Sequence, residues 1–306
     1  MDKIWYGLVR IGIIHPMIFP STIKGEGPVV ETVSRIANDE FFDAIEIRRI
    51  TDSNARNEVK KILNTSSIST VIAGQPPILA GKLNLNSEDE TERKKAIDDV
   101  KLSVDEAEFF RAERVVILSG PNTDETKREK AKTLLIDSLV NISLYAKEKG
   151  VEIALETFDY SIDKKCLIGP TKEAVEVAKT TKRKCPNFGL AIDLSHLPLL
   201  NERAMDALTL ARDYLTHVHI GNCVMRDKAH PAYGDNHPRF GIIGGENSIA
   251  ELAVFLKALF KTGYLRKKAT ENPNIVSFEV KPVGDESIEA VIANSKRTWQ
   301  KAWSLI

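Results

Sequence analysis

The stretch from residue 188 to residue 223 contains two apolar segments that end in polar side chains. They read Phe188-Gly-Leu-Ala-Ile-Asp193-Leu-Ser-His196 and Leu215-Thr-His217-Val-His219-Ile-Gly-Asn-Cys223. Successive side chains of a strand point to opposite faces, so Asp193 and His219 each lie on the face opposite the large apolar residues beside them. A parallel strand that is buried on both faces should be apolar throughout. The polar residues at the C-terminal ends therefore need a specific explanation.

Two further segments repeat this pattern. They are Val151-Glu-Ile-Ala-Leu-Glu156 and Ile275-Val-Ser-Phe-Glu279-Val-Lys281. In each segment the large apolar residues share one face, and a glutamate lies on the other face near the C-terminal end. Glu156, Asp193, His219 and Glu279 are therefore candidates for a common centre.

The remaining chain alternates strand and helix patterns around these segments. Further strands are expected at residues 5–14, 41–50, 69–73 and 114–119. Helices are expected at residues 29–38, 53–63, 87–111, 124–149, 201–214, 248–262 and 287–303 and after Thr171, with a capping box at Ser87 and Glu90. Eight strands alternating with helices over 306 residues predict an α/β protein, a (β/α)8 TIM barrel, with residues 1–306 forming a single domain. Active sites of such barrels lie at the C-terminal strand ends.

The composition favours a soluble cytoplasmic protein. Lys plus Arg equal Asp plus Glu at 43 each, so the net charge of zero does not favour nucleic acid as a partner, although a local basic groove stays open. Cys166, Cys185 and Cys223 are an odd number without a CxxC spacing, which argues against a disulfide framework. The N-terminal residues have no long apolar segment, and no later apolar run reaches the length of a membrane span, so no membrane partner is expected.

Three carboxylates and one imidazole are a ligand set for a divalent cation. Buried together, Glu156, Asp193, His219 and Glu279 would have a formal charge of about −3, which a cation must offset. Oxygen-rich sets with one histidine favour Mn²⁺ or Mg²⁺, and Co²⁺ or Zn²⁺ are also compatible. The alternative is that each acid caps a helix or pairs with a basic residue. Four such residues with the same facing at strand ends favour the metal site.

Short motifs around these residues resemble those of a known superfamily. Leu155-Glu156, Ile192-Asp193-Leu-Ser-His196, Val218-His219 and Phe278-Glu279 resemble the xylose-isomerase-like (AP endonuclease family 2) TIM barrels. That superfamily includes D-tagatose 3-epimerase-type sugar epimerases, hydroxypyruvate isomerases and metal-dependent abasic-site endonucleases. The resemblance extends over about residues 4–299. It implies that the four residues bind one metal, that His196 lies near the substrate, and that the protein forms a homodimer or homotetramer.

A second resemblance lies in the long loop at residues 222–247. Asp235-Asn-His237-Pro-Arg239 is similar to the Asp-x-His segment of the endonuclease branch, which implies a second metal at His196, Asp235 and His237. The alternative is that Asp235 and His237 only order their loop. The endonucleases also take histidines from earlier strand ends, whereas here those ends read Ala73-Gly-Gln and Leu118-Ser-Gly. A complete trinuclear site is therefore not expected.

The resemblance implies a metal-dependent isomerase or epimerase of a small sugar or sugar acid. Glu156 and Glu279 would act as the acid and base, one removing a proton next to a carbonyl and the other returning it, through a metal-chelated enediolate. One alternative is a metal-dependent lyase that decarboxylates a 3-oxo sugar acid. Another is a phosphodiesterase similar to the abasic-site endonucleases, and a third is a descendant that only binds.

Further residues are candidates for substrate contacts or for the interior of the barrel. Lys281 is expected either to bind a carboxylate or phosphate or to neutralise the acidic cluster. Arg239 is a second anion-binding candidate or an exposed loop residue, and His15 either touches substrate or is structural.

Large aromatic and interior polar residues complete the set. Trp5, Phe19 and Phe158 are expected in the core, with a pocket wall as the alternative. We also expect Glu46 to pair with Arg48 inside the barrel, and His217 to be a hydrogen-bonded interior residue.

Overall fold

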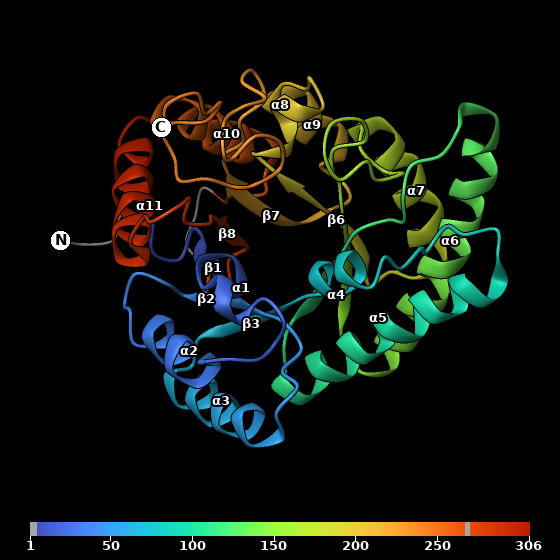
Figure 1. Cartoon of the computed structure of the whole chain (residues 1–306), viewed down its shortest axis with the longest axis horizontal. Helices are drawn as coiled ribbons and strands as arrows, with labels where there is room; N and C mark the ends of the chain where they lie inside the picture. Colours follow the sequence, from blue (N-terminus) through green and yellow to red (C-terminus); the bar gives the residue numbers. More distant parts are fainter. Residues whose placement is uncertain (1–4, 267–269) are drawn as a thin grey trace.

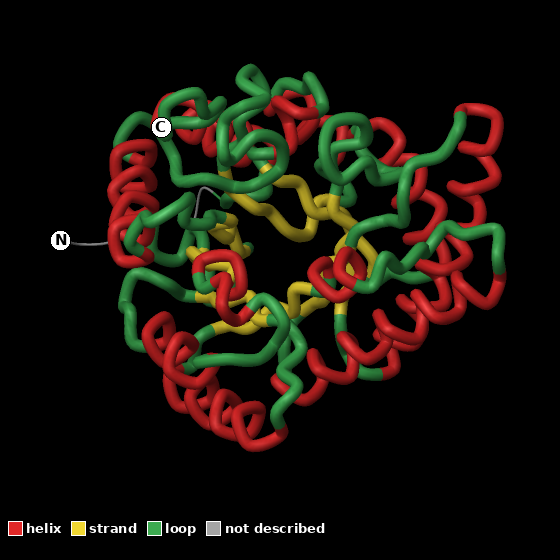
Figure 2. Tube along the Cα trace, in the orientation of Figure 1, coloured by secondary structure: helices red, strands yellow, loops and turns green. Residues whose placement is uncertain are grey.

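The strands of the protein form a closed parallel barrel. The computed structural model describes residues 5–266 and 270–306. Within them eight strands pair in chain order, and β8 pairs with β1 to close the ring (Figures 1 and 2). The strands are β1 (Arg10–Ile14), β2 (Ala44–Ile47), β3 (Ser69–Ala73), β4 (Arg114–Ile117), β5 (Glu152–Glu156), β6 (Phe188–Asp193), β7 (Leu215–Gly221) and β8 (Ile275–Glu279). The predicted (β/α)8 TIM barrel is confirmed.

Helices surround the ring of strands and connect one strand to the next, as Figure 2 shows. The longer ones are α2 (Val29–Ala37), α3 (Ser53–Ser66), α5 (Glu90–Phe110), α6 (Glu125–Glu148), α7 (Thr171–Lys184), α9 (Ala204–Ala211), α10 (Ile249–Thr262) and α11 (Ile288–Trp303). Short helices follow three strands directly, namely α1 (His15–Ile18) with the 3₁₀ turn η1 (Pro20–Thr22), α4 (Gln75–Ala80) and α8 (His196–Leu199). None of the helices in the described residues has both the length and the apolar character that crossing a bilayer requires.

The predicted alternation of strand faces is confirmed by two separate apolar clusters. The outward residues, such as Leu190 and Val218, join one large cluster with the surrounding helices. The inward apolar residues form a second, small cluster that includes Ala154 and Ala191. Small inward side chains leave room inside the barrel, and polar residues fill that room.

The ends of several elements differ from the prediction. β1 begins at Arg10 because residues 5–8 form a turn in which the Leu8 N–H donates to the Trp5 carbonyl at 2.9 Å. β2, β4 and α9 are also shorter than expected. The predicted capping box at Ser87 is wrong, since the carboxylate of Asp89 accepts from the N–H groups of Thr91 and Glu92 and caps α5.

A bulge between β6 and β7 decides which side chains of β7 face inward. Leu190 pairs with Leu215, but the next residue, Ala191, pairs with His217, so Thr216 is an extra residue on β7. Leu215 therefore packs in the outer cluster, although His217, two residues later, faces inward. After the bulge Asp193 pairs with His219, which places the two side chains next to each other at the rim.

The narrow interior predicts a stability test at Gly12 of β1. A Cβ atom there would lie 2.3 Å from the Ser277 Oγ and 3.3 Å from the Ala44 Cβ. We expect Gly12→Ala to lower the free energy of unfolding by about 1–3 kcal/mol in urea titrations, because the packed interior cannot expand freely. Adding Ser277→Ala should recover part of this loss, since it removes the closest atom. An additive double mutant would contradict the steric explanation.

Candidate metal centre at the C-terminal end of the barrel

Four side chains from four consecutive strands meet at the C-terminal end of the barrel. Glu156, Asp193 and Glu279 are the last residues of β5, β6 and β8, and His219 lies near the end of β7. One ligand atom from each lies within 4.8 Å of those of the other three. His219 Nδ1 is 2.9 Å from Glu156 Oε1 and 3.2 Å from Glu279 Oε2. The structure therefore brings together the four residues that the strand ends indicated.

Two of the carboxylates use one oxygen for a hydrogen bond to a residue outside the cluster. Asp193 Oδ1 accepts from the Ser195 N–H at 2.7 Å, and Glu156 Oε2 accepts from Gln75 Nε2 at 2.7 Å. By contrast, Asp193 Oδ2 and Glu279 Oε2 are buried and have no hydrogen bond of good geometry to any described residue. A buried carboxylate oxygen without a partner is costly, and a divalent cation would satisfy several at once. The donor set thus fits a cation such as Mn²⁺, Mg²⁺, Co²⁺ or Zn²⁺.

Burial and charge act against each other in this cluster. Burial raises the pKa of the Asp193 carboxyl above its usual value, although His196 and His237 oppose that change. Burial also works against charge on His219, but the carboxylates of Glu46 and Glu156 outweigh it and raise the pKa of His219 well above its usual value. In the metal-free protein, a proton on histidine therefore offsets part of the negative charge that a cation would otherwise offset.

The second group of predicted ligands lies beside the first. Asp235 Oδ1 is 3.0 Å from His196 Nε2 and 2.9 Å from His237 Nε2. The other ring nitrogens are held elsewhere, His196 Nδ1 by the Thr157 carbonyl at 2.7 Å and His237 Nδ1 by the Ser195 hydroxyl at 3.2 Å. The structure therefore brings His196, Asp235 and His237 together, with their free nitrogens directed at one carboxylate.

A cavity of about 400 Å³ opens beside these two groups. Its floor includes Glu279, His237 and Asp235, and its walls include Met17, Leu79 and Phe158, with the Phe158 ring 4.5 Å from that of His196. Four basic residues also line it, namely Lys24, Arg48, Lys164 and Lys281. This size and mixture of apolar walls and few polar groups suit a small organic molecule.

The other predicted contact residues take different places. Lys281 lines the cavity, and its backbone N–H donates to the His237 carbonyl at 2.7 Å. Arg239 pairs with Glu286 at 2.7 Å and is not among the described residues of the cavity wall. His15 is buried, with Nε2 2.8 Å from the Thr32 hydroxyl, and burial lowers its pKa to about 3.

The aromatic candidates divide between core and cavity. Trp5 packs in the outer core against Trp299 and Trp303, and Phe19 belongs to the same apolar cluster. Phe158 belongs to that cluster and also lines the cavity.

The interior pair predicted between Glu46 and Arg48 is wrong. Glu46 is fully buried, and its carboxylate is 2.7 Å from His217 Nε2 and 3.2 Å from His219 Nε2. Arg48 instead donates to the backbone carbonyls of Ile23 and Arg49 at the cavity rim. The sequence pattern predicts that Glu46 lies on the inner face of the barrel. It does not predict the contact between Glu46 and His219, because these residues are far apart in the chain. The expected hydrogen bond of His217 is present.

Gln75 was also missed by sequence reasoning. It begins α4, with one residue between it and the end of β3, and its side-chain amide donates to Glu156 Oε2 at 2.7 Å. The signal in the sequence was a side-chain amide just after β3, on the rim where β5, β6 and β8 end in carboxylates.

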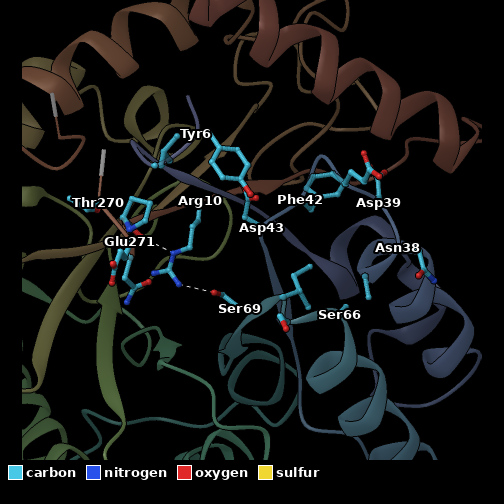
Figure 3. A pocket seen from close by; sticks show the side chains of 18 residues that line it. Tyr6, Arg10, Asn38, Asp39, Phe42, Asp43, Ser66, Ser69, Thr270 and Glu271 are labelled. Carbon is cyan, nitrogen blue, oxygen red and sulfur yellow. Dashed lines mark hydrogen bonds between the residues drawn. The ribbon is translucent and has the colours of Figure 1, made fainter. Parts of the chain in front are cut away.

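A second, larger cavity lies at the opposite end of the barrel, where β1 and β3 begin (Figure 3). It has a volume of about 650 Å³ and includes Arg10, Asp43, Ser69 and Glu271 in its lining. The Arg10 guanidinium donates to the Ser69 hydroxyl and to the Pro273 carbonyl, both at 2.7 Å, and pairs with Glu113. The guanidinium of Arg10 is therefore already bonded to neighbouring protein groups. The convergent acids and histidines lie at the other end.

Comparison with known proteins gives the same fold. A curated-protein search finds no significant sequence match. Similar solved structures include a D-tagatose 3-epimerase-like protein, with a TM-score of 0.72 and 16% identity over 97% of this chain and 98% of that one. The IOLI protein with a binding zinc atom has a TM-score of 0.70 and 18% identity over 96% and 98%. The 3-keto-D-glucoside 4-epimerase YcjR from E. coli has a TM-score of 0.69 and 15% identity over 95% and 99%.

At such low identities these structures share the fold with this chain. The family assignment comes from the sequence itself, because the model described as xylose isomerase-like TIM barrel matches residues 35–299. That is more than half of the chain, and the resemblance of the strand-end motifs is thereby confirmed. The chain belongs to the xylose isomerase-like TIM barrel family.

Proposed function

We propose that the protein is a metal-dependent isomerase or epimerase of a small sugar or sugar acid. The main support is the convergence of Glu156, Asp193, His219 and Glu279 within 4.8 Å of one another. Glu279 also lines a cavity of about 400 Å³, so a bound molecule would touch this cluster. The similar structures that are named as sugar epimerases are consistent with this proposal.

The four residues would hold one divalent cation, most simply Mn²⁺ or Mg²⁺ given three carboxylates and one imidazole. When bound, the cation supplies a Lewis acid that lowers the cost of negative charge on a substrate carbonyl oxygen. His196, Asp235 and His237 are proposed as a second cation site, since both histidines direct Nε2 at Asp235.

The two glutamates are proposed as the groups that move the proton. Glu156 and Glu279 approach His219 Nδ1 from different strands, at 2.9 and 3.2 Å. Glu279 forms part of the cavity wall, and Glu156 lies behind Gln75, which also lines the cavity. One carboxylate would remove the proton next to the carbonyl, and the other would return it to the opposite face or to the neighbouring carbon.

A decarboxylating lyase is the second candidate, favoured by the basic residues of the cavity. Lys281 and Lys164 could hold the carboxylate of a 3-oxo sugar acid. Loss of carbon dioxide leaves the same enediolate as loss of a proton, so the same residues would serve.

A phosphodiesterase is supported less. β3 and β4 are followed by Gly74-Gln75 and Leu118-Ser119, which lack the histidines of the endonuclease branch.

Metal binding is tested by thermal unfolding. Adding Mn²⁺ to about 100 times its dissociation constant should stabilise the protein by about 3 kcal/mol, because the folded state alone has the site. Asp193→Asn should lose this stabilisation. Asp99→Asn is the matched control, since Asp99 pairs with Arg49 outside the cluster, and it should keep the full shift. Equal shifts in both variants would rule out the proposed ligand set.

Proton transfer is tested by deuterium exchange from solvent into a panel of ketoses and keto acids. Glu279→Gln should slow exchange by about 100-fold or more, because the carboxylate that accepts the proton is gone. The control Glu286→Gln removes a carboxylate that pairs with Arg239 and should leave exchange unchanged. Release of carbon dioxide, with solvent deuterium only in the decarboxylated product, would favour the lyase. A metal-loaded protein that does neither with any compound would refute both.

The role of Lys281 is tested with an acidic and a neutral substrate of the same carbon skeleton. Lys281→Met should raise KM for the acid by about 10- to 100-fold, the value of a hydrogen bond to a charged group, and leave KM for the neutral sugar unchanged. Lys261→Met, on the exposed side of α10, is the control. Equal effects on both substrates would mean that Lys281 only neutralises the acidic cluster.

A further inference from the structure

A buried carboxylate that the proposed mechanism does not use lies beneath the metal centre. Glu46 extends from β2 into the barrel and is fully buried. His219 Nε2 is 3.2 Å from each of its oxygens, and His217 Nε2 is 2.7 Å from Oε1. Glu46 therefore contacts both inward histidines of β7 at once.

The two nitrogens of His219 face different partners. Nε2 faces Glu46, whereas Nδ1 faces Glu156 and Glu279 at the centre. A neutral imidazole has one N–H donor and one lone pair, and an ionised carboxylate only accepts. Both nitrogens thus face carboxylates, and with a cation at Nδ1 the proton of His219 would lie on Nε2 and be donated to Glu46. This is the tautomer that a cation at the centre requires.

His217 holds the carboxylate of Glu46 in place. Its Nε2 donates to Glu46, and its Nδ1 is buried without a hydrogen-bond partner among the described residues, as suits a nitrogen without a proton. The rings of His217 and His219 meet edge to face, with centroids 4.9 Å apart at 88°. The inward residues Gly12 and Ala44 are small, which leaves space for this second polar layer.

We propose that Glu46, held by His217, is a positioning residue for His219. It keeps the proton on Nε2 and presents Nδ1 to the cation, and it has no direct contact with substrate. The inference rests on the proposed function, because it assumes a cation at the cluster of Glu156, Asp193, His219 and Glu279. It adds a supporting layer that the ligand set does not include.

The first test measures Zn²⁺ affinity by competition with a chelator, without reference to activity. Glu46→Gln keeps the volume of the side chain but removes its charge. We expect Zn²⁺ to bind about 10- to 100-fold more weakly with unchanged stoichiometry, the usual effect of losing such a supporting group. Glu106→Gln is the matched control, because Glu106 is a buried carboxylate that pairs with Arg56 away from the site. It should lose stability and keep its Zn²⁺ affinity.

The second test uses the wild-type protein, so it holds even where Glu46→Gln does not fold. Nitrogen-15 NMR of the six histidines in the Zn²⁺-loaded protein should show His219 with its proton on Nε2 and the metal on Nδ1. The opposite tautomer would overturn the inference, and so would Zn²⁺ affinity in Glu46→Gln within about twofold of the wild type. A lower stoichiometry would make Glu46 a ligand, which also overturns it. Wild-type protein that binds no Zn²⁺ or Mn²⁺ would refute the proposed function itself.

Discussion

Three carboxylates buried around one imidazole constrain everything near them in the barrel. Removing such charges from water costs several kcal/mol for each ion unless partners replace the lost hydration. Here Ser195 and Gln75 each hold one carboxylate oxygen, and His219 lies between Glu156 and Glu279. One ligand atom from each of the four residues lies within 4.8 Å of those of the other three. An arrangement that is poorly satisfied by protein groups alone is well suited to a cation, because the ligands need little rearrangement to bind it.

The interior of the barrel supports this cluster from below. Barrels of this kind are filled by layers of side chains from alternate strands. In this chain many inward positions are small, such as Ala154 and Ala191, so a polar layer fits between the apolar floor and the mouth. Glu46 and His217 form that layer, in which the imidazole of His217 is hydrogen-bonded to the carboxylate of Glu46. The packing inside the barrel thus orients His219, so that its Nε2 faces Glu46 and its Nδ1 faces the centre.

Above the cluster, the loops determine what can reach it. The loop after β7 brings Asp235 and His237 to the rim, and Lys164 donates to the Asp235 carbonyl at 3.0 Å. Apolar residues of the short helices α1 and α4 line the other side of the cavity. Basic groups beside this acidic cluster suit a molecule with an oxygen-rich end and an anionic end.

The amino-acid pattern was enough to predict the barrel, the facing of its strands and the four strand-end residues. This was possible because side-chain alternation is a local property, and an isolated Glu156 or Asp193 on a buried strand stands out against its neighbours. Only the tertiary structure decided the partners of these residues. The contact of Glu46 with His219 joins positions 173 residues apart, and the bulge at Thr216 depends on how β7 fits against Gly189 of β6. Such pairings follow from barrel closure and packing, which no local pattern encodes.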